Sequence, residues 1–361
     1  MSNPLNKKIR LLIVDDSVFF RKALSNALSS DPRIEVVGMA VDAMDAMSKI
    51  TSLRPDVVTL DVEMPKLNGI DFLKKLIPIH PIPVVVVSSL PLRVLDALDA
   101  GAVDFVRKSD GTSPDAMKNF MSELIIKVKI ASTAKVGRVK KTASAPSSSA
   151  PNAIKSAAKP LTLLGNTDKN TVIAIGASTG GTEAILEVVK DLPPTTPGII
   201  IVQHMPPVFT NMYAQRLDRC CKMSVKEAQN GDRVEPGKII IGAGEYHLRL
   251  AKDARGYYVK SEQGEKVSGH CPSVDVMFDS VAAVAGANAM GIELTGMGAD
   301  GAKGLLKMRQ AGAYTVGQDK DSCVVYGMPM VAFNIGAVQK QLPLSDIGPE
   351  IIRYLNGKKP S

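Results

Sequence analysis

The sequence predicts an α/β protein with two doubly wound parallel sheets. In both halves of the 361-residue chain, short runs of apolar, β-branched residues alternate with segments of helical periodicity. Between the halves lies a stretch dominated by Ser, Ala, Pro and Lys, without apolar periodicity. We therefore expect a first domain over residues 7–130, a flexible linker over residues 131–168 and a second domain over residues 169–356.

The first domain contains five runs that we expect to be strands, each followed by a helical pattern. A last helix, which can close the sheet, would place six apolar residues on one face: Met117, Phe120, Met121, Leu124, Ile125 and Val128. Right-handed crossovers then favour the flavodoxin-like strand order 2-1-3-4-5, with strands one and three side by side. The expected strands span residues 9–14, 35–39, 56–60, 83–87 and 104–106.

Acidic residues follow the two strands that this order places together. Asp15 and Asp16 end the first strand, and Asp61 ends the third. Three neighbouring carboxylates repel one another, and a hard divalent cation with oxygen ligands relieves that repulsion. Ser88 ends the fourth strand and Lys108 follows the fifth, so a hydroxyl and an ammonium group are expected at the same edge.

The charge of the chain does not point to nucleic acid. The formal net charge is +8, but residues 131–160 of the predicted linker alone supply six basic residues and no acidic one. Aromatic residues make up 4% of the chain, Trp is absent, and no aromatic and basic residues interleave. The six basic residues of the linker are Lys135, Arg138, Lys140, Lys141, Lys155 and Lys159.

The amino terminus and the cysteines indicate a cytoplasmic protein that is not inserted in a membrane. The apolar run at residues 11–14 is too short for a signal peptide and much too short to span a bilayer. The four cysteines lack Cys-x-x-Cys spacing, and the adjacent pair Cys220 and Cys221 disfavours a disulfide. We expect all four as reduced, structural thiols.

The second domain is organised around residues 172–181, which predict a strand, a tight turn and a helix. Ser178 lies on the turn, where unpaired backbone N–H groups at the start of a helix stabilise negative charge. Residues 176–180 match the Gly-x-Ser-x-Gly pattern of a nucleophile, although such turns also bind phosphate or only save space. The turn alone leaves these alternatives open.

Two later strands supply the partners that a serine nucleophile needs. His204 follows the apolar run 198–202, and Asp300 follows the run 289–294. A base removes the hydroxyl proton and an acid orients the base, so Ser178, His204 and Asp300 predict nucleophilic catalysis. The order Ser, His, Asp differs from that of α/β-hydrolases. A binding protein with a structural serine turn and a nucleotide-dependent enzyme remain as alternatives. The other histidines, His80, His247 and His270, are expected at surface or structural positions.

The first domain resembles a response-regulator receiver. The motifs are Asp15-Asp16, Asp61-Val-Glu-Met-Pro-Lys-Leu-Asn-Gly69, Ser88-Ser89 and Gly101-Ala-Val-Asp-Phe105 with Lys108. The resemblance implies that a histidine kinase donates phosphate to Asp61, with Mg²⁺ held by Asp16 and Asp61 and, through water, by Asp15. It also implies that Ser88 and Lys108 bind the phosphoryl group and that Phe105 is a switch aromatic.

The chain departs from the receiver pattern in two places. Lys108 precedes Ser109 where the family has proline with a cis peptide, and a cis bond before another residue costs about 2.5–4 kcal/mol. We expect a trans bond or strain there. The segment from Ser88 to Gly101 is also shorter than in close relatives. We expect this difference to affect the switch face around the fourth helix more than the phosphorylation chemistry.

The second domain resembles the catalytic domain of the chemotaxis protein-glutamate methylesterases. The motifs are Ile175-Gly-Ala-Ser-Thr-Gly-Gly-Thr182, Gln203-His204-Met-Pro206, His270-Cys-Pro-Ser-Val-Asp-Val276, Leu294-Thr-Gly-Met-Gly-Ala-Asp-Gly-Ala302 and Tyr326-Gly-Met-Pro329. The receiver, the linker and this domain together resemble that family over nearly the whole chain. The resemblance implies hydrolysis of glutamate γ-methyl esters on chemoreceptors, with deamidation of receptor glutamine in many members, and no cofactor in the esterase site.

The same resemblance assigns roles within the second domain. It implies Ser178 as nucleophile, His204 as base and Asp300 as the group that orients His204, with Thr179 and the Met297 backbone beside the developing oxyanion. Glu293 departs from the family, which has an apolar residue there, and it is expected either near the site or paired with a neighbour. The unphosphorylated receiver is expected to dock over the catalytic crevice, and phosphorylation of Asp61 to loosen that interface.

Overall fold

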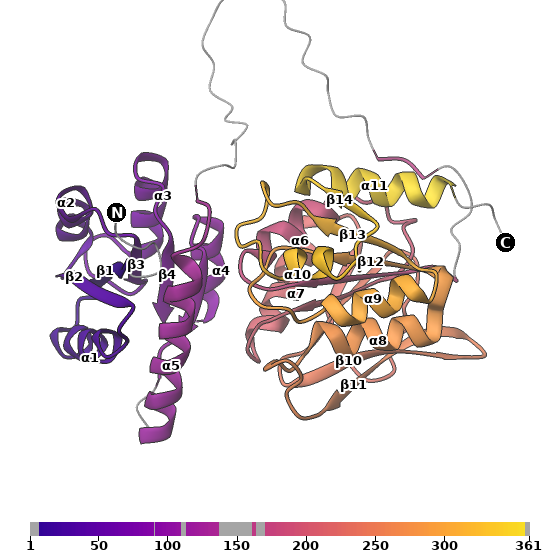
Figure 1. The fold of residues 1–361 in the computed structure, drawn as a ribbon, viewed down its shortest axis with the longest axis horizontal. Coiled ribbons are helices and arrows are strands. Elements are labelled where there is room, and N and C mark those ends of the chain that lie inside the picture. The colour runs from indigo at the N-terminus through magenta and orange to yellow at the C-terminus, as the bar shows by residue number, and fades with distance from the viewer. Residues whose placement is uncertain (1–6, 90, 110–112, 137–160, 164–169, 358–361) are drawn as a thin grey trace, which may run out of the picture.

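The computed structural model describes residues 7–89, 91–109, 113–136, 161–163 and 170–357. Most of the predicted linker, residues 137–160 and 164–168, lies outside these ranges, as does residue 169 of the predicted second domain. The described elements form two α/β units that lie side by side (Figure 1). Among the described helices, none is both long and apolar enough to cross a bilayer.

The first unit contains a five-stranded sheet whose strands are all parallel, in the order β2-β1-β3-β4-β5. The predicted flavodoxin-like order is therefore confirmed. Its strands are β1 (Ile9–Val14), β2 (Ile34–Ala40), β3 (Val57–Asp61), β4 (Val84–Ser88) and β5 (Asp104–Arg107). Its helices are α1 (Val18–Ser29), α2 (Ala43–Leu53), α3 (Gly69–Ile79), α4 (Pro91–Asp99) and α5 (Pro114–Ala131).

Local sequence explains the helix boundaries of this unit. Ser17, Asp42, Asn68 and Ser113 each cap a helix with a side-chain oxygen that accepts a backbone N–H of the first turn. The strands β3 and β4 are buried at every position because helices cover both faces of the sheet. Helix α5 buries Phe120, Leu124 and Val128, as predicted from their spacing.

The second unit contains a seven-stranded parallel sheet in the order β14-β13-β12-β6-β7-β9-β8. An antiparallel hairpin, β10 (Tyr246–Asp253) with β11 (Gly256–Gln263), packs beside it against α8. The sheet strands are β6 (Val172–Ala177), β7 (Ile199–Gln203), β8 (Ser224–Glu227), β9 (Lys238–Ile241), β12 (Ala289–Glu293), β13 (Tyr314–Gln318) and β14 (Lys340–Leu342). The helices are α6 (Gly181–Val189), α7 (Phe209–Cys220), α8 (Val274–Ala285), α9 (Ala302–Gln310), α10 (Met328–Asn334) and α11 (Leu344–Gly357), with a 3₁₀ turn at Gly286–Asn288.

Strand β6 lies at the centre of this sheet, between β12 and β7. All six of its residues are buried. In a doubly wound sheet the central strands carry the site at their carboxyl ends, where the crossovers diverge to opposite sides. The turn that contains Ser178 therefore leaves the sheet at the position that this fold uses for ligands.

The two units contact each other through α4 of the first unit, which packs against α6 and α7 of the second. Arg216 on α7 forms ion pairs with Asp99 at the end of α4 and with Glu183 on α6. Lys135, just beyond α5, donates its backbone N–H to the carbonyl of Val324 at 3.0 Å. Its ammonium group donates to the carbonyl of Lys320 at 2.9 Å.

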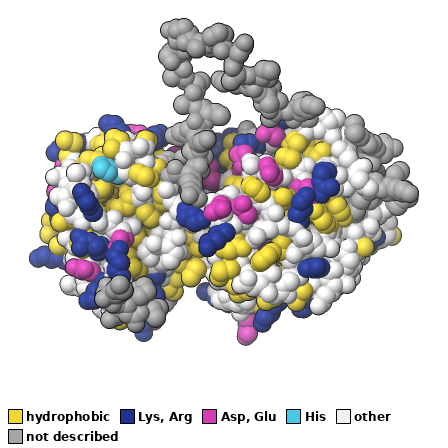
Figure 2. Space-filling view, turned by 45° about the horizontal axis from the view of Figure 1, so that its top comes forward, with side chains coloured by type: hydrophobic (Ala, Val, Ile, Leu, Met, Phe, Trp, Pro, Cys, Tyr) yellow, Lys and Arg dark blue, Asp and Glu magenta, His cyan; other side chains and the backbone are white. Residues whose placement is uncertain are grey.

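Charges of both signs mix on the surface drawn in Figure 2, where Lys and Arg side chains are interspersed with Asp and Glu. A large field of one sign, which favours polyanion binding, is not seen among the side chains coloured there. The four cysteines, Cys220, Cys221, Cys271 and Cys323, are free thiols, as expected.

Candidate active site and phosphorylation site

The turn after β6 exposes Ser178 by means of closely packed glycines. Gly180 has φ +77°, a left-handed conformation that favours glycine, and a Cβ there would lie 2.6 Å from the Val324 side chain. The N–H of Gly181 donates to the carbonyl of Ser178 at 2.7 Å, and the side-chain amide of Gln203 donates to the same carbonyl at 2.9 Å. These contacts hold the serine backbone at the start of α6.

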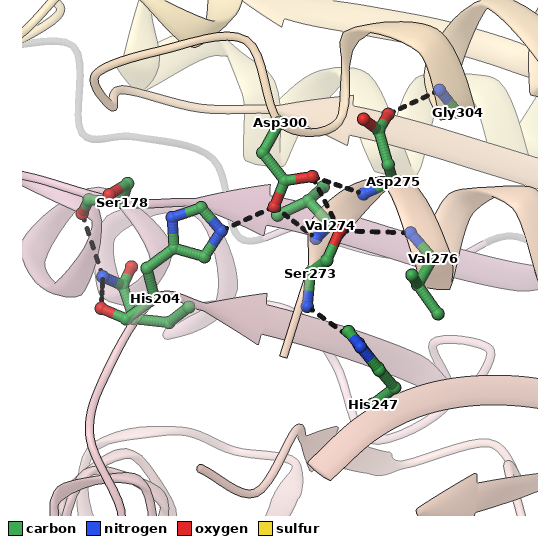
Figure 3. Close-up of polar contacts among 10 residues, drawn as sticks. Ser178, His204, His247, Ser273, Val274, Asp275, Val276, Asp300 and Gly304 are labelled. Atoms are coloured by element: carbon green, nitrogen blue, oxygen red, sulfur yellow. Dashed lines mark hydrogen bonds and ion pairs between the residues drawn. The ribbon is translucent and has the colours of Figure 1, made fainter. Parts of the chain in front are cut away.

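The ring of His204 lies between Ser178 and Asp300 (Figure 3). Its Nε2 is 2.8 Å from Oδ2 of Asp300. An ionised carboxylate only accepts hydrogen bonds, so we assign the proton to Nε2. Among the described residues, nothing lies within hydrogen-bond distance of Nδ1, the nitrogen on the Ser178 side. The free lone pair of the ring is therefore on the side of the candidate nucleophile.

The amino terminus of α8 holds Asp300 as an anion. The Asp300 carboxylate accepts the Ser273 hydroxyl at 2.7 Å and the backbone N–H groups of Val274 at 2.8 Å and Asp275 at 3.1 Å (Figure 3). Burial alone would raise the pKa of Asp300, but the hydrogen bonds from His204, Ser273 and Asp275 outweigh it and lower the pKa. Asp300 therefore stays ionised and fixes the tautomer of His204.

The structure brings two further histidines to this segment. His270 was expected at a surface or structural position, but its ring stacks on His204 with a centroid distance of 3.6 Å. His247 lies on strand β10 at a buried, structural position, as expected, and its Nδ1 accepts the N–H of Ser273 at 3.3 Å. The signal for His270 was its place in the motif 270–276, since the same motif supplies Ser273 and α8.

Glu293 lies beneath the site on β12, and its side chain is fully buried. No partner lies within hydrogen-bond distance of either carboxylate oxygen in the described part of the chain. Burial, then the charges of Asp300 and Asp275, raise the pKa of Glu293 well above its usual value. The first of the two expectations is therefore met, because Glu293 lies near the site. The second is not, because Glu293 is not paired with a neighbour in the described part of the chain. The raised pKa favours the neutral form of the Glu293 carboxyl beside Asp300.

Residues 295–298 pack against the serine turn. The N–H of Ser178 donates to the carbonyl of Thr295 at 3.0 Å, and a Cβ at Gly296 would lie 2.8 Å from that of Ser178. Met297 follows on the same turn with its side chain 45% exposed. Met297 thus follows directly after two residues that contact Ser178, and it is partly exposed.

The acidic residues of the first unit converge as predicted. One carboxylate oxygen from each of Asp15, Asp16 and Asp61 lies within 4.8 Å of the others. The Lys108 ammonium donates to Asp15 at 2.9 Å and to Asp61 at 2.5 Å. Three carboxylates and one ammonium leave an excess of negative charge and hard oxygen donors, a donor set that suits Mg²⁺. Ser88 lies at the buried end of β4.

The Lys108–Ser109 peptide bond is trans, as predicted from the cost of a cis bond before a residue other than proline. Among the described residues, the one cis peptide is Cys271–Pro272. The shortened segment between Ser88 and Gly101 still contains helix α4, which forms part of the contact with the second unit.

Strand β5 of the first unit meets the serine turn of the second. The hydroxyl of Thr179 donates to Oδ2 of Asp104 at 2.6 Å, and both residues are buried. The other oxygen of Asp104 accepts the Lys127 ammonium at 2.7 Å. The neighbouring Phe105 packs on Phe209 of α7 with a centroid distance of 4.7 Å. In this structure the residue beside Ser178 is therefore bonded to the first unit rather than free for a substrate.

The fold and the two sites define a class of protein, a receiver domain joined to a second α/β domain with a candidate hydrolytic site. Comparisons with known proteins agree with this class. Residues 11–117 match the response regulator receiver domain model, and residues 173–351 match the CheB methylesterase model.

Similar proteins match nearly the whole chain. A protein-glutamate methylesterase/protein-glutamine glutaminase of Syntrophomonas wolfei is 53% identical over 97% of this chain and 98% of its own. A protein-glutamate methylesterase/protein-glutamine glutaminase of Syntrophotalea carbinolica is 50% identical over 98% of this chain and 99% of its own. The crystal structure of the Thermotoga maritima CheB methylesterase catalytic domain is 35% identical, with TM-score 0.50, over 51% of this chain and 98% of its own. The chain belongs to the protein-glutamate methylesterase/protein-glutamine glutaminase family.

Proposed function

We propose that Ser178, His204 and Asp300 carry out the hydrolysis that defines this family, with residues 169–356 as the catalytic domain and residues 7–130 as its receiver. The chain is a phosphorylation-activated protein-glutamate methylesterase and protein-glutamine glutaminase that serves chemotactic adaptation. The observation that carries the proposal is the orientation of the His204 ring, with Nε2 bonded to Asp300 and Nδ1 on the side of Ser178.

The reaction follows from this orientation. Nδ1 of His204 takes the hydroxyl proton of Ser178 as the oxygen attacks the ester carbonyl. The tetrahedral intermediate expels methanol, which receives that proton from His204, and an acyl-enzyme remains. Water then attacks the acyl group, with His204 again as base, and releases the glutamate carboxylate and free Ser178. A glutamine side chain would follow the same course and release ammonia.

Asp300 contributes by keeping the proton on Nε2 and by stabilising the imidazolium form of His204. We assign Thr179 and the Met297 backbone as donors to the developing oxyanion, and each such donor contributes about 2.7–4 kcal/mol. Because the Thr179 hydroxyl is bonded to Asp104, this assignment requires the receiver to move away before the site works.

The acyl-enzyme provides the test of this mechanism. Full-length protein would be activated with a small phosphodonor, mixed with an activated ester substrate, quenched in acid within one turnover and digested. We expect an acyl adduct on the peptide that contains Ser178, because deacylation is a separate step. Hydrolysis without an adduct under conditions that trap other serine acyl-enzymes would contradict nucleophilic catalysis by Ser178.

We also propose that Asp61 is the phosphoacceptor, that Asp15, Asp16 and Asp61 hold Mg²⁺, and that Ser88 and Lys108 bind the phosphoryl group. When bound, Mg²⁺ would offset part of the 1.5–2 negative charges, roughly, that phosphorylation adds. A histidine kinase would donate the phosphate, chemoreceptors would be the substrates, and Phe105 would transmit the change to the interface. We propose a cytoplasmic location because such a kinase draws on ATP, which that compartment supplies.

Asp61→Asn is expected to abolish activation by a small phosphodonor while leaving basal hydrolysis within about twofold, because the substitution removes the nucleophilic carboxylate without adding bulk. Methanol release with and without phosphodonor measures this. Asp71→Asn, on the half-exposed start of α3, is the matched control and should respond as wild type. Full activation of Asp61→Asn would show that phosphate acts at another residue.

A further inference from the structure

The ring of His270 covers one face of the ring that we assign as general base. The two rings are nearly parallel, at 8°, with centroids 3.6 Å apart. His270 is held by two backbone hydrogen bonds with Val267, at 3.0 and 2.9 Å, which close a tight turn through Ser268 and Gly269. Both residues within this turn have positive φ angles, 53° and 84°. The stacked ring is therefore carried by a closed turn rather than by a free loop end.

The His204 ring needs support of this kind. Its only hydrogen bond among the described residues is the one from Nε2 to Asp300. A single hydrogen bond at one edge of the ring leaves the ring free to rotate about χ2, which is a broad torsion in histidine. A flat group packed on its face prevents that swing and keeps Nδ1 directed at the Ser178 side. A displacement of about 1 Å at a reacting group can lower a rate by about a hundredfold.

The position of His270 in the chain links it to the same machinery. Three residues later, Ser273 caps α8 and donates to Asp300. The short segment 270–275 thus holds both the ring of His204 and the carboxylate that orients it. None of the proton transfers described above uses His270, and it has no hydrogen bond to Asp300 among the contacts found in the described residues.

His270 is neutral at the pH at which the reaction runs. Burial, followed by the neighbouring His204, lowers the pKa of His270 to about 4. A neutral ring can lie against His204 when that residue takes up a proton, whereas a second cation would oppose the proton. The charged or titratable groups that act on His270 are His204, Asp300, Lys266 on its own loop and Lys127 on α5.

We propose that His270 is a positioning residue for the general base: its neutral ring fixes the plane of His204 and shields it from water on one face. The proposal rests on the proposed function, since it gives His204 the role of base. It assigns His270 no contact with the substrate and no proton transfer. A flat, uncharged side chain at position 270 should therefore preserve the role, and a small side chain should not.

The test compares His270→Phe, which keeps a flat neutral ring, with His270→Ala, which removes it, in the full-length phosphorylated protein. Methanol release from methylated receptor gives kcat and KM across pH. For His270→Ala we expect kcat to fall about 10- to 100-fold with KM within about twofold, because geometry and not substrate binding is lost. His270→Phe should keep kcat within about threefold. His80→Ala, in the first unit, is the control and should match wild type.

The pH profile separates positioning from a general effect on folding. Without the stacked ring, water can hydrate the imidazolium form, so the acid limb of kcat/KM in His270→Ala should move to higher pH. His270→Arg keeps a flat group but adds a cation, so its acid limb should move to lower pH. A fold that is merely weakened would not shift the limb in opposite directions. Circular dichroism of each variant verifies that it is folded.

Two results would overturn the proposal. One is a His270→Ala protein with the kcat and the acid limb of wild type. The other is equal loss of kcat in His270→Phe and His270→Ala, which would assign the imidazole itself to the chemistry. Hydrolysis that survives in Ser178→Ala or His204→Ala would refute the proposed function instead. If those two variants are inactive and His270→Ala is normal, only the inference about His270 fails.

Discussion

Ser178→Ala is expected to lower kcat for methyl ester hydrolysis by up to about 10⁶-fold. A loss of this size is seen when the serine nucleophile is removed from a catalytic triad. In the proposed mechanism the hydroxyl oxygen of Ser178 forms the acyl-enzyme, and the neighbouring residues of the turn cannot replace it. Methanol release by the phosphorylated full-length protein, measured at saturating substrate, gives the ratio directly. Deamidation of receptor glutamine should fall in parallel, because both reactions use the same hydroxyl.

The matched control is Ser345→Ala, the same substitution at an exposed position in α11 of the same unit. Its rate should equal that of wild type. Receiver phosphorylation should remain normal in Ser178→Ala, which would demonstrate that the loss is confined to catalysis. If Ser178→Ala retains more than about a tenth of the wild-type rate, Ser178 is not the nucleophile and the serine turn has a structural role.

Asp104→Ala is expected to raise the rate of the unphosphorylated protein. The substitution removes the acceptor of the Thr179 hydroxyl and leaves the Lys127 ammonium without its closest carboxylate. A hydrogen bond to a charged group contributes about 1.5–3 kcal/mol, so its loss should favour the undocked form by about 10- to 100-fold. Basal methanol release should rise by up to that factor, and activation by a phosphodonor should shrink correspondingly.

Asp115→Ala serves as the control, because Asp115 is exposed on the first turn of α5 in the same unit. It should leave both rates unchanged. If Asp104→Ala keeps the low basal rate and the full activation of wild type, the contact between β5 and the serine turn does not restrain the enzyme. The rate of proteolysis of the segment between the units measures docking independently, and we expect faster cleavage in Asp104→Ala.

Much of the fold could be predicted because the sequence repeats a simple alternation. The strands of the first unit agree with the predicted ranges to within two residues, for example Ile9–Val14 and Val84–Ser88. Apolar β-branched runs mark buried parallel strands whatever their neighbours are. The contact between the units was expected in outline, but its residues were not, since nothing in the sequence near Asp104 indicates a bond to Thr179.

The sequence predicted those residues of the candidate site that directly follow a strand. It did not predict those that come from loops or helix starts. Ser178 and His204 come immediately after β6 and β7, so strand order alone places them together. His270 and Ser273 come from a loop and a helix start, and only the folded chain brings them to His204 and Asp300. Glu293 could not be resolved in advance, because a buried acid without a partner contradicts the usual rule for strand interiors.

The hydrogen bond between Thr179 and Asp104 has a consequence for the direction in which signals travel. Coupling between two sites is reciprocal in free energy, so whatever phosphorylation of the receiver does to access at Ser178, occupancy of the crevice does to the receiver. A receptor side chain bound beside Thr179 would keep Asp104 and β5 released. The receiver would then be held in the form that phosphate favours, and an enzyme engaged with its substrate would be the better phosphoacceptor.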